Sequence, residues 1–146
     1  MANKDVLNST IDGFKANEAI PNVIVGFDGF IDEIIHLVDE RQAVDAYTRI
    51  ENMKDLAARI DQAAGKSCNI EMVVQQAKLG GNGPIMANAL VAQGRKVSYC
   101  GALGEQDIHP VFKEFAEKCE QVISFSDPGH TDALEFFDGK IMMGKH

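Results

Sequence analysis

The stretch LGGNGPIMANALVAQG, residues 79–94, places three glycines and an asparagine within four residues and follows them with a proline and an alanine-rich apolar run. Glycine adopts backbone angles that other residues avoid, and it lets a ligand approach the main chain without meeting a Cβ. Pro84 suits the first turn of a helix, which we expect over Ile85–Ala92 with Gly94 ending it. The stretch therefore predicts a turn that aims free backbone amides at a hydroxyl-rich or anionic ligand. A tight strand-to-helix connection without a ligand explains the same residues.

Short apolar runs and helical patterns alternate on both sides of this turn. The β-branched run Val23–Val25 predicts a buried strand, and CNIEMVVQQAKL, residues 68–79, predicts a second strand that leads into the glycines. A strand starting at Lys96, a helix from Pro110 to Cys119 and a strand over 121–125 follow. This order favours an α/β fold with a largely parallel sheet.

Three segments lie outside that alternation. Residues 46–64 carry apolar side chains at helical spacing and predict an amphipathic helix that ends near Gly65. Leu7, Ile11 and Phe14 predict a short N-terminal helix. The segment TDALEFFDGKIMMG, residues 131–144, has two strand-like runs around Asp138-Gly139 and predicts a hairpin appended to the sheet.

Composition excludes several classes of protein. With 146 residues, 45% of them hydrophobic, and a net charge of −8, the chain suits one globular domain and is a poor partner for nucleic acid. The three cysteines lie far apart and predict reduced packing residues. There is no signal-peptide core and no apolar run long enough to span a membrane, so we expect a cytoplasmic protein that does not bind membranes.

The four histidines give no indication of a metal centre. His36, His109, His130 and His146 show no metal-ligand spacing with cysteines or acidic residues. We therefore expect surface or packing histidines and no metal site.

A second polar group follows the first predicted strand, in the segment GFDGFIDE, residues 26–33. In an open α/β sheet, ligands bind at the carboxyl ends of the strands, which is where Asp28 and Asp32 would emerge. Carboxylates at that place can accept hydrogen bonds from sugar hydroxyls. The alternative is that Asp28 caps a turn and that Asp32 begins a solvated run with Glu33.

Four segments taken in order, GFDGFID, GGNGPIMANALVAQG, VSYCGALGEQD and DALEFFDGK, resemble the N-terminal half of the ribokinase-like, or PfkB-type, carbohydrate kinases. The resemblance runs from about Asn22 to the end of the chain. It implies a Rossmann-type sheet with flanking helices and an appended β-lid, truncated here, with lid elements at about 33–45, 66–79 and 131–144. Because a parallel sheet without its later strands would expose an apolar edge, we expect either a homodimer through the lid strands or partial unfolding.

The same resemblance implies roles for particular residues. Asp32 is the position that binds the hydroxyls of the acceptor sugar, and Asp28 is a second contact. The glycine signature falls on Gly80, Gly81 and Gly83, with Asn82 placed to reach the substrate. The segment 101–107, GALGEQD, is similar to a turn of the family at the end of a strand. The acceptor implied is a sugar or a nucleoside.

Two departures from the family pattern have consequences. The signature asparagine is replaced by Ile85, which removes a polar contact, and Asn88 stands one turn further along the helix. The family's Gly-Ala-Gly-Asp motif, which supplies the catalytic base and an anion hole, is absent, as are its ATP-binding segments. The sequence therefore predicts no catalytic residue in this chain, no ATP or Mg²⁺ bound by it alone, and no activity by itself.

Two readings of the function remain open at this point. The first is the substrate-binding half of an ATP-dependent sugar or nucleoside kinase. The second is a non-catalytic module that binds or dimerises through its hairpin. A dinucleotide-binding domain has little support, because no Gly-x-Gly-x-x-Gly motif follows the first strand.

Overall fold

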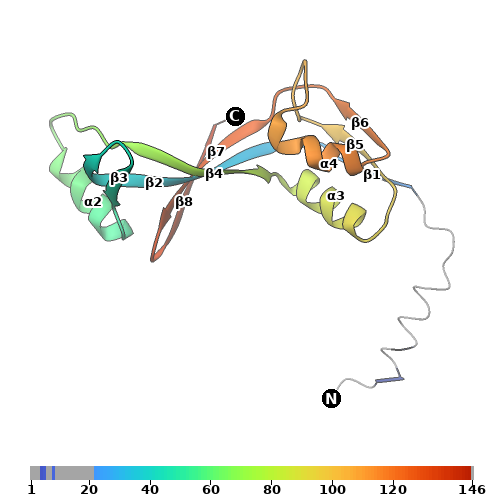
Figure 1. The fold of residues 1–146 in the computed structure, drawn as a ribbon, viewed down its shortest axis with the longest axis horizontal. Coiled ribbons are helices and arrows are strands. Elements are labelled where there is room, and N and C mark those ends of the chain that lie inside the picture. Colours follow the sequence, from blue (N-terminus) through green and yellow to red (C-terminus); the bar gives the residue numbers. More distant parts are fainter. Residues whose placement is uncertain (1–3, 6–7, 9–21, 146) are drawn as a thin grey trace.

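The computed structural model describes residues 4–5, 8 and 22–145. The helix predicted around Leu7, Ile11 and Phe14 lies outside the described residues. From Val23 onward the chain forms two β-sheets. Figure 1 shows them toward opposite ends of the long axis, with β2, β4 and β7 running between the two ends.

The first sheet has three parallel strands in the order β1-β5-β6. Its strands and the helices around it are β1 (Val23–Val25), α3 (Asn82–Ala92), β5 (Val97–Gly101), the 3-10 turn η1 (Pro110–Phe112), α4 (Lys113–Lys118) and β6 (Gln121–Ser124). The α3 and α4 helices pack on the same face, over a core that includes Tyr99, Phe112 and Phe115. The predicted alternation of strands and helices around a parallel sheet is confirmed.

The other face of this sheet has apolar side chains in solvent. Ile24 on β1 is 80% exposed, Ile123 on β6 is 51% exposed, and Phe125 just beyond β6 is 54% exposed. Ile24 is opposite Ser98, and Cys100 is opposite Ile123, so these four side chains lie on the same face. Parallel sheets are usually covered on both faces. This one is covered on a single face within the described residues.

The second sheet is mixed and larger than the predicted hairpin. Its strands are β2 (Phe30–Ala43), β3 (Ala46–Arg49), β4 (Met72–Gly80), β7 (Gly129–Phe136) and β8 (Gly139–Lys145). The β2 strand pairs antiparallel with β3 and β4 and parallel with β7, and β7 pairs antiparallel with β8. The hairpin predicted around Asp138-Gly139 is confirmed, since Phe136 pairs with Gly139.

The helix predicted over residues 46–64 is wrong in its first part. Residues 46–49 form β3, and the α2 helix spans only Met53–Gln62. The long β2 strand turns back at residues 44–45, so pairing with β2 satisfies the backbone of β3 and overrides the helical spacing of its side chains. The remaining helix packs Leu56 into a second core with Ile35 and Leu134.

Candidate functional site

The first feature of the site is the carboxylate of Asp28, which caps the glycine-rich turn. Asp28 lies in the loop after β1, and its Oδ2 and Oδ1 atoms accept hydrogen bonds from the backbone amides of Asn82 and Gly83, both at 2.7 Å. These amides open α3, whose N-cap residue is Gly81 with φ of 89°. A carboxylate is stabilised there both by the amides and by the positive end of the helix dipole. The prediction of free amides is therefore wrong for these two groups, which are held by Asp28.

Tyr99 fixes the loop that carries Asp28. The side chain of Tyr99 is buried in the first core, and its hydroxyl donates a hydrogen bond to the backbone carbonyl of Asp28. Burial, with a smaller contribution from the charge of Asp28, raises the pKa of the Tyr99 hydroxyl well above its usual range. A Cβ added to Gly83 would lie 2.6 Å from both the Tyr99 hydroxyl and Asp28 Oδ1. Glycine is therefore the residue that fits at this position.

The second carboxylate, Asp32, lies against Gly80, at the start of the same turn. Asp32 is half-buried on β2, and in the β2–β4 pairing it stands opposite Lys78, while Phe30 stands opposite Gly80. A Cβ added to Gly80 would come within 2.5 Å of the Asp32 carboxylate carbon. The missing side chain of Gly80 thus makes room for the carboxylate. The structure brings Asp28 and Asp32, from the segment 26–33, together with residues 80–83, which lie about fifty positions further along the chain.

The surface around this turn is open and partly apolar. A shallow depression beside the Asp28 loop is lined by Phe27, Asn82 and Met86, among others. Ile85, which replaces the family's asparagine, is 54% exposed on α3, and Asn82 and Asn88 are also exposed. The side chain of Ile85 is therefore partly in solvent on the helix that Asp28 caps, with the amide side chains of Asn82 and Asn88 on the same helix.

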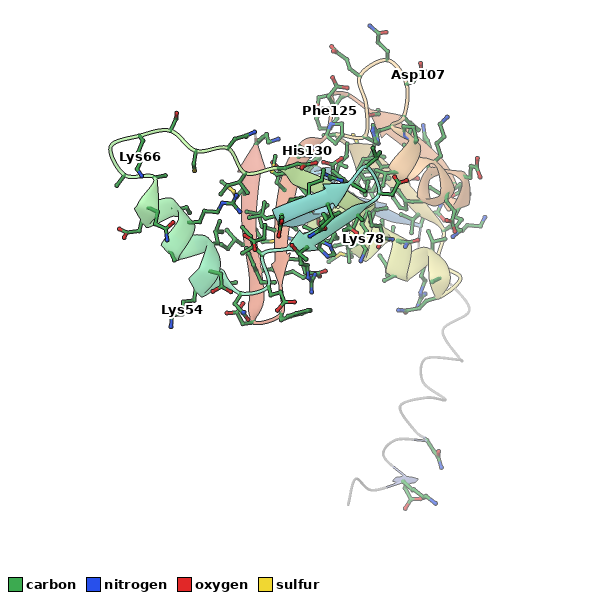
Figure 2. The ribbon with its side chains drawn as sticks, turned by 60° about the vertical axis from the view of Figure 1, so that its left-hand side comes forward. Lys54, Lys66, Lys78, Asp107, Phe125 and His130 are labelled. Carbon is green, nitrogen blue, oxygen red and sulfur yellow. The ribbon has the colours of Figure 1, made fainter. Side chains whose placement is uncertain are left out.

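A second depression also includes Asp28 in its lining. Its lining includes Gly29, Pro128, His130 and Lys145. The sequence analysis did not single out Lys145 or Tyr99 for this region. A polar tyrosine within the buried strand β5 is a signal that a sequence can show, whereas the lysine is brought here only by the pairing of β7 with β8. Figure 2 labels His130 in the crowded central part of the molecule and Asp107 on a projecting loop.

This fold, with its two carboxylates beside a glycine turn, places the chain among the ribokinase-like carbohydrate kinases, as the motifs predict. Residues 2–146 match the family model described as prokaryotic ketohexokinase. The chain belongs to the prokaryotic ketohexokinase family.

Known proteins resemble the chain in sequence or in fold. A ketohexokinase of Haloferax volcanii is 33% identical over 123 residues, which cover 83% of this chain and 32% of that protein. A fructokinase structure from Xylella fastidiosa shares the fold with a TM-score of 0.51 at 14% identity, covering 86% of this chain and 32% of its own. The structure of the nucleoside kinase of Methanocaldococcus jannaschii matches with a TM-score of 0.52 at 8% identity. The match covers 85% of this chain and 36% of that kinase. The chain thus spans about a third of the length of these relatives.

In the part of the chain that the structure describes, no helix has the length and apolar character needed to cross a membrane.

Proposed function

We propose that this chain is the sugar-binding part of an ATP-dependent kinase that phosphorylates a ketohexose. The family and the ketohexokinase of Haloferax volcanii support a ketohexose as acceptor. The observation that carries the proposal is the convergence of two neighbouring carboxylates on a glycine turn that is distant in sequence, where Asp32 lies against Gly80 and Asp28 binds Asn82 and Gly83.

Asp32 is the residue proposed to hold the acceptor. A carboxylate can accept hydrogen bonds from two adjacent hydroxyls, and such charge-assisted bonds are stronger than neutral ones. Asp28 is the second proposed contact. Each of its oxygens already accepts one backbone bond, so it would meet the sugar through its remaining lone pairs. Asn82, exposed at the start of α3, adds an amide that can both donate and accept.

The glycine-rich start of α3 does not fit a phosphate of ATP. The glycine-rich helix terminus that would suit a phosphate holds the carboxylate of Asp28, which repels a phosphate. ATP supplies the transferred phosphoryl group, and Mg²⁺ offsets its developing charge. We propose that both bind the part of the relatives that this chain does not span. The five-stranded sheet, around residues 33–45, 66–79 and 131–144, is proposed as the lid over the sugar.

Isothermal titration of D-fructose into the purified chain tests the sugar site. We expect saturable binding that is lost in Asp32→Asn and kept in Asp55→Asn, since Asp55 is an exposed carboxylate in the first turn of α2. Titration with adenosine separates a nucleoside acceptor from a sugar. Equal binding of fructose by the parent chain and by Asp32→Asn contradicts the proposal, as does an absence of binding by the parent.

The second candidate function is a module that dimerises through its strands. The observation in its favour is that Met142 and Met143 on β8, the last strand of the path β3-β2-β7-β8, are 56% and 54% exposed. Sedimentation velocity at two concentrations tests it. A dimer that dissociates in Met142→Lys, combined with no sugar binding, favours this function over the first.

A further inference from the structure

Three side chains of metal-binding type converge on the five-stranded sheet, and one of them, His130, also lines the depression that adjoins Asp28. His130 Nε2 lies 3.1 Å from Glu33 Oε2 and 3.1 Å from Asp132 Oδ1. One ligand atom from each of the three residues lies within 4.8 Å of the other two. From this geometry we propose that Glu33, His130 and Asp132 form a binding site for a divalent transition metal such as Zn²⁺.

The spacing of the ligand atoms suits one shared ion. With metal–ligand distances of about 2.0–2.2 Å, two ligands of a tetrahedral zinc ion are roughly 3.3–3.5 Å apart. The two histidine–carboxylate distances of 3.1 Å are therefore a few tenths of an ångström short of that value. Small rotations of the side chains would bring each histidine–carboxylate pair to that spacing, and the third separation, between the two carboxylates, is at most 4.8 Å.

The donor set selects the kind of metal. An imidazole nitrogen with two carboxylate oxygens suits Zn²⁺ and neighbouring transition metals, whereas Mg²⁺ and Ca²⁺ prefer sites made of oxygen alone. The side chains of Glu33 and His130 are 28% and 30% exposed, so an ion can reach the cluster. Asp132 is a buried residue, which limits the positions that its carboxylate can take.

Strand pairing holds the three ligands in place. Glu33 on β2 stands directly opposite Asp132 on the parallel strand β7, and His130 stands opposite the neighbouring Ile31. Ile31 packs on the first core and Ile35 belongs to the second, so the cluster lies between the two apolar cores on that face of β2. A bound ion would cross-link β2 and β7 at this junction.

The positive charge of Lys145 should lower the affinity of the cluster for a metal ion, and this effect can be measured. Its ammonium group lies 3.0 Å from Asp132 Oδ2, which leaves Oδ1 toward the histidine. Asp132 would therefore bind the ion through one oxygen, and the positive charge of Lys145 would weaken the attraction of a cation. Removal of that charge is expected to tighten metal binding.

The sequence analysis expects no metal site, and this proposal revises that expectation. Glu33 and His130 are 97 residues apart, so no local spacing links them. The proposal does not depend on the proposed sugar site, because Glu33 and Asp32 are adjacent on β2 and their side chains point to opposite faces of the sheet.

The test uses the chain without a histidine tag, freed of metal by a chelator. We expect Co²⁺ to bind at one ion per chain with visible absorption bands, to lack a sulfur-to-cobalt charge-transfer band, and to be displaced by Zn²⁺. Affinity should fall at least about tenfold in His130→Ala and in Glu33→Gln, the second of which preserves the shape of the side chain. It should rise several-fold in Lys145→Met.

The matched control is His36→Ala. His36 also faces a carboxylate on a neighbouring strand, Glu135 at 3.8 Å, but Arg49 Nη1 lies 2.6 Å from the same nitrogen and excludes a cation. Its substitution should leave metal affinity unchanged. The proposal would be overturned if the parent bound neither Co²⁺ nor Zn²⁺. It would also be overturned if Glu33→Gln and His130→Ala each bound the metal as tightly as the parent does. An affinity that stays the same or falls in Lys145→Met would overturn the assignment of Asp132.

Discussion

Substitution of Asp28 by alanine should destabilise the chain through the start of α3. Asp28→Ala removes the acceptor for two amides, those of Asn82 and Gly83. The Asn82 amide belongs to an exposed residue and can bind water instead, so its loss is expected to cost about 1 kcal/mol, as for an ordinary N-cap. Gly83 is buried, and an unsatisfied buried amide costs about 1–3 kcal/mol. Together the expected loss in the free energy of unfolding is about 2–4 kcal/mol.

Urea denaturation followed by circular dichroism measures this loss. Asp28→Asn keeps one oxygen acceptor and replaces the other with an NH₂ group, which can only donate. Its loss in the free energy of unfolding should therefore be about half that of Asp28→Ala. The control is Asp107→Ala, since Asp107 is an exposed acid on the projecting loop of Figure 2. A loss below about 0.5 kcal/mol in Asp28→Ala, within the usual range of surface substitutions, would refute the capping role.

Three further outcomes follow from the same contacts. Gly80→Ala should displace the Asp32 carboxylate, because the new Cβ would lie 2.5 Å from its carbon, and should abolish fructose binding in a titration while the circular dichroism spectrum stays unchanged. The raised pKa of Tyr99 means that the unfolded chain loses this proton first as the pH rises, so stability should fall above about pH 10. Urea midpoints measured across that range should fall less steeply in Tyr99→Phe than in the parent. Ile123→Lys should reduce self-association of the chain in sedimentation experiments, because it charges the exposed apolar face of the three-stranded sheet.

The elements that the sequence predicts well are those fixed by local signals. The Val23–Val25 strand, the helix after the glycine turn and the hairpin at Asp138-Gly139 each combine a periodic pattern with a turn residue, and all three are present. Residues 46–49 are different, because pairing with a strand that the pattern did not reveal decides their structure.

The candidate site also has a part that local sequence signals indicate and a part that depends on distant contacts. The two aspartates and the glycine turn could be identified from residue type and order. The sequence could not show that Asp28 occupies the amides of that turn, because this contact joins residues 54 and 55 positions apart. Prediction from a single sequence reaches the candidates for a site, while the contacts between them depend on how distant strands pair.

The alternation of side chains along β2 has a consequence for how this segment can vary. Asp32 points toward the glycine turn, and its neighbours Ile31 and Glu33 point to the opposite face, over the two cores. Deletion of one residue between Gly29 and Asp32 would turn every later side chain of β2 to the wrong side, moving Asp32 into the interior and Ile35 into water. Point substitutions here should therefore be graded in effect, whereas single insertions and deletions should abolish both the fold of this sheet and the site.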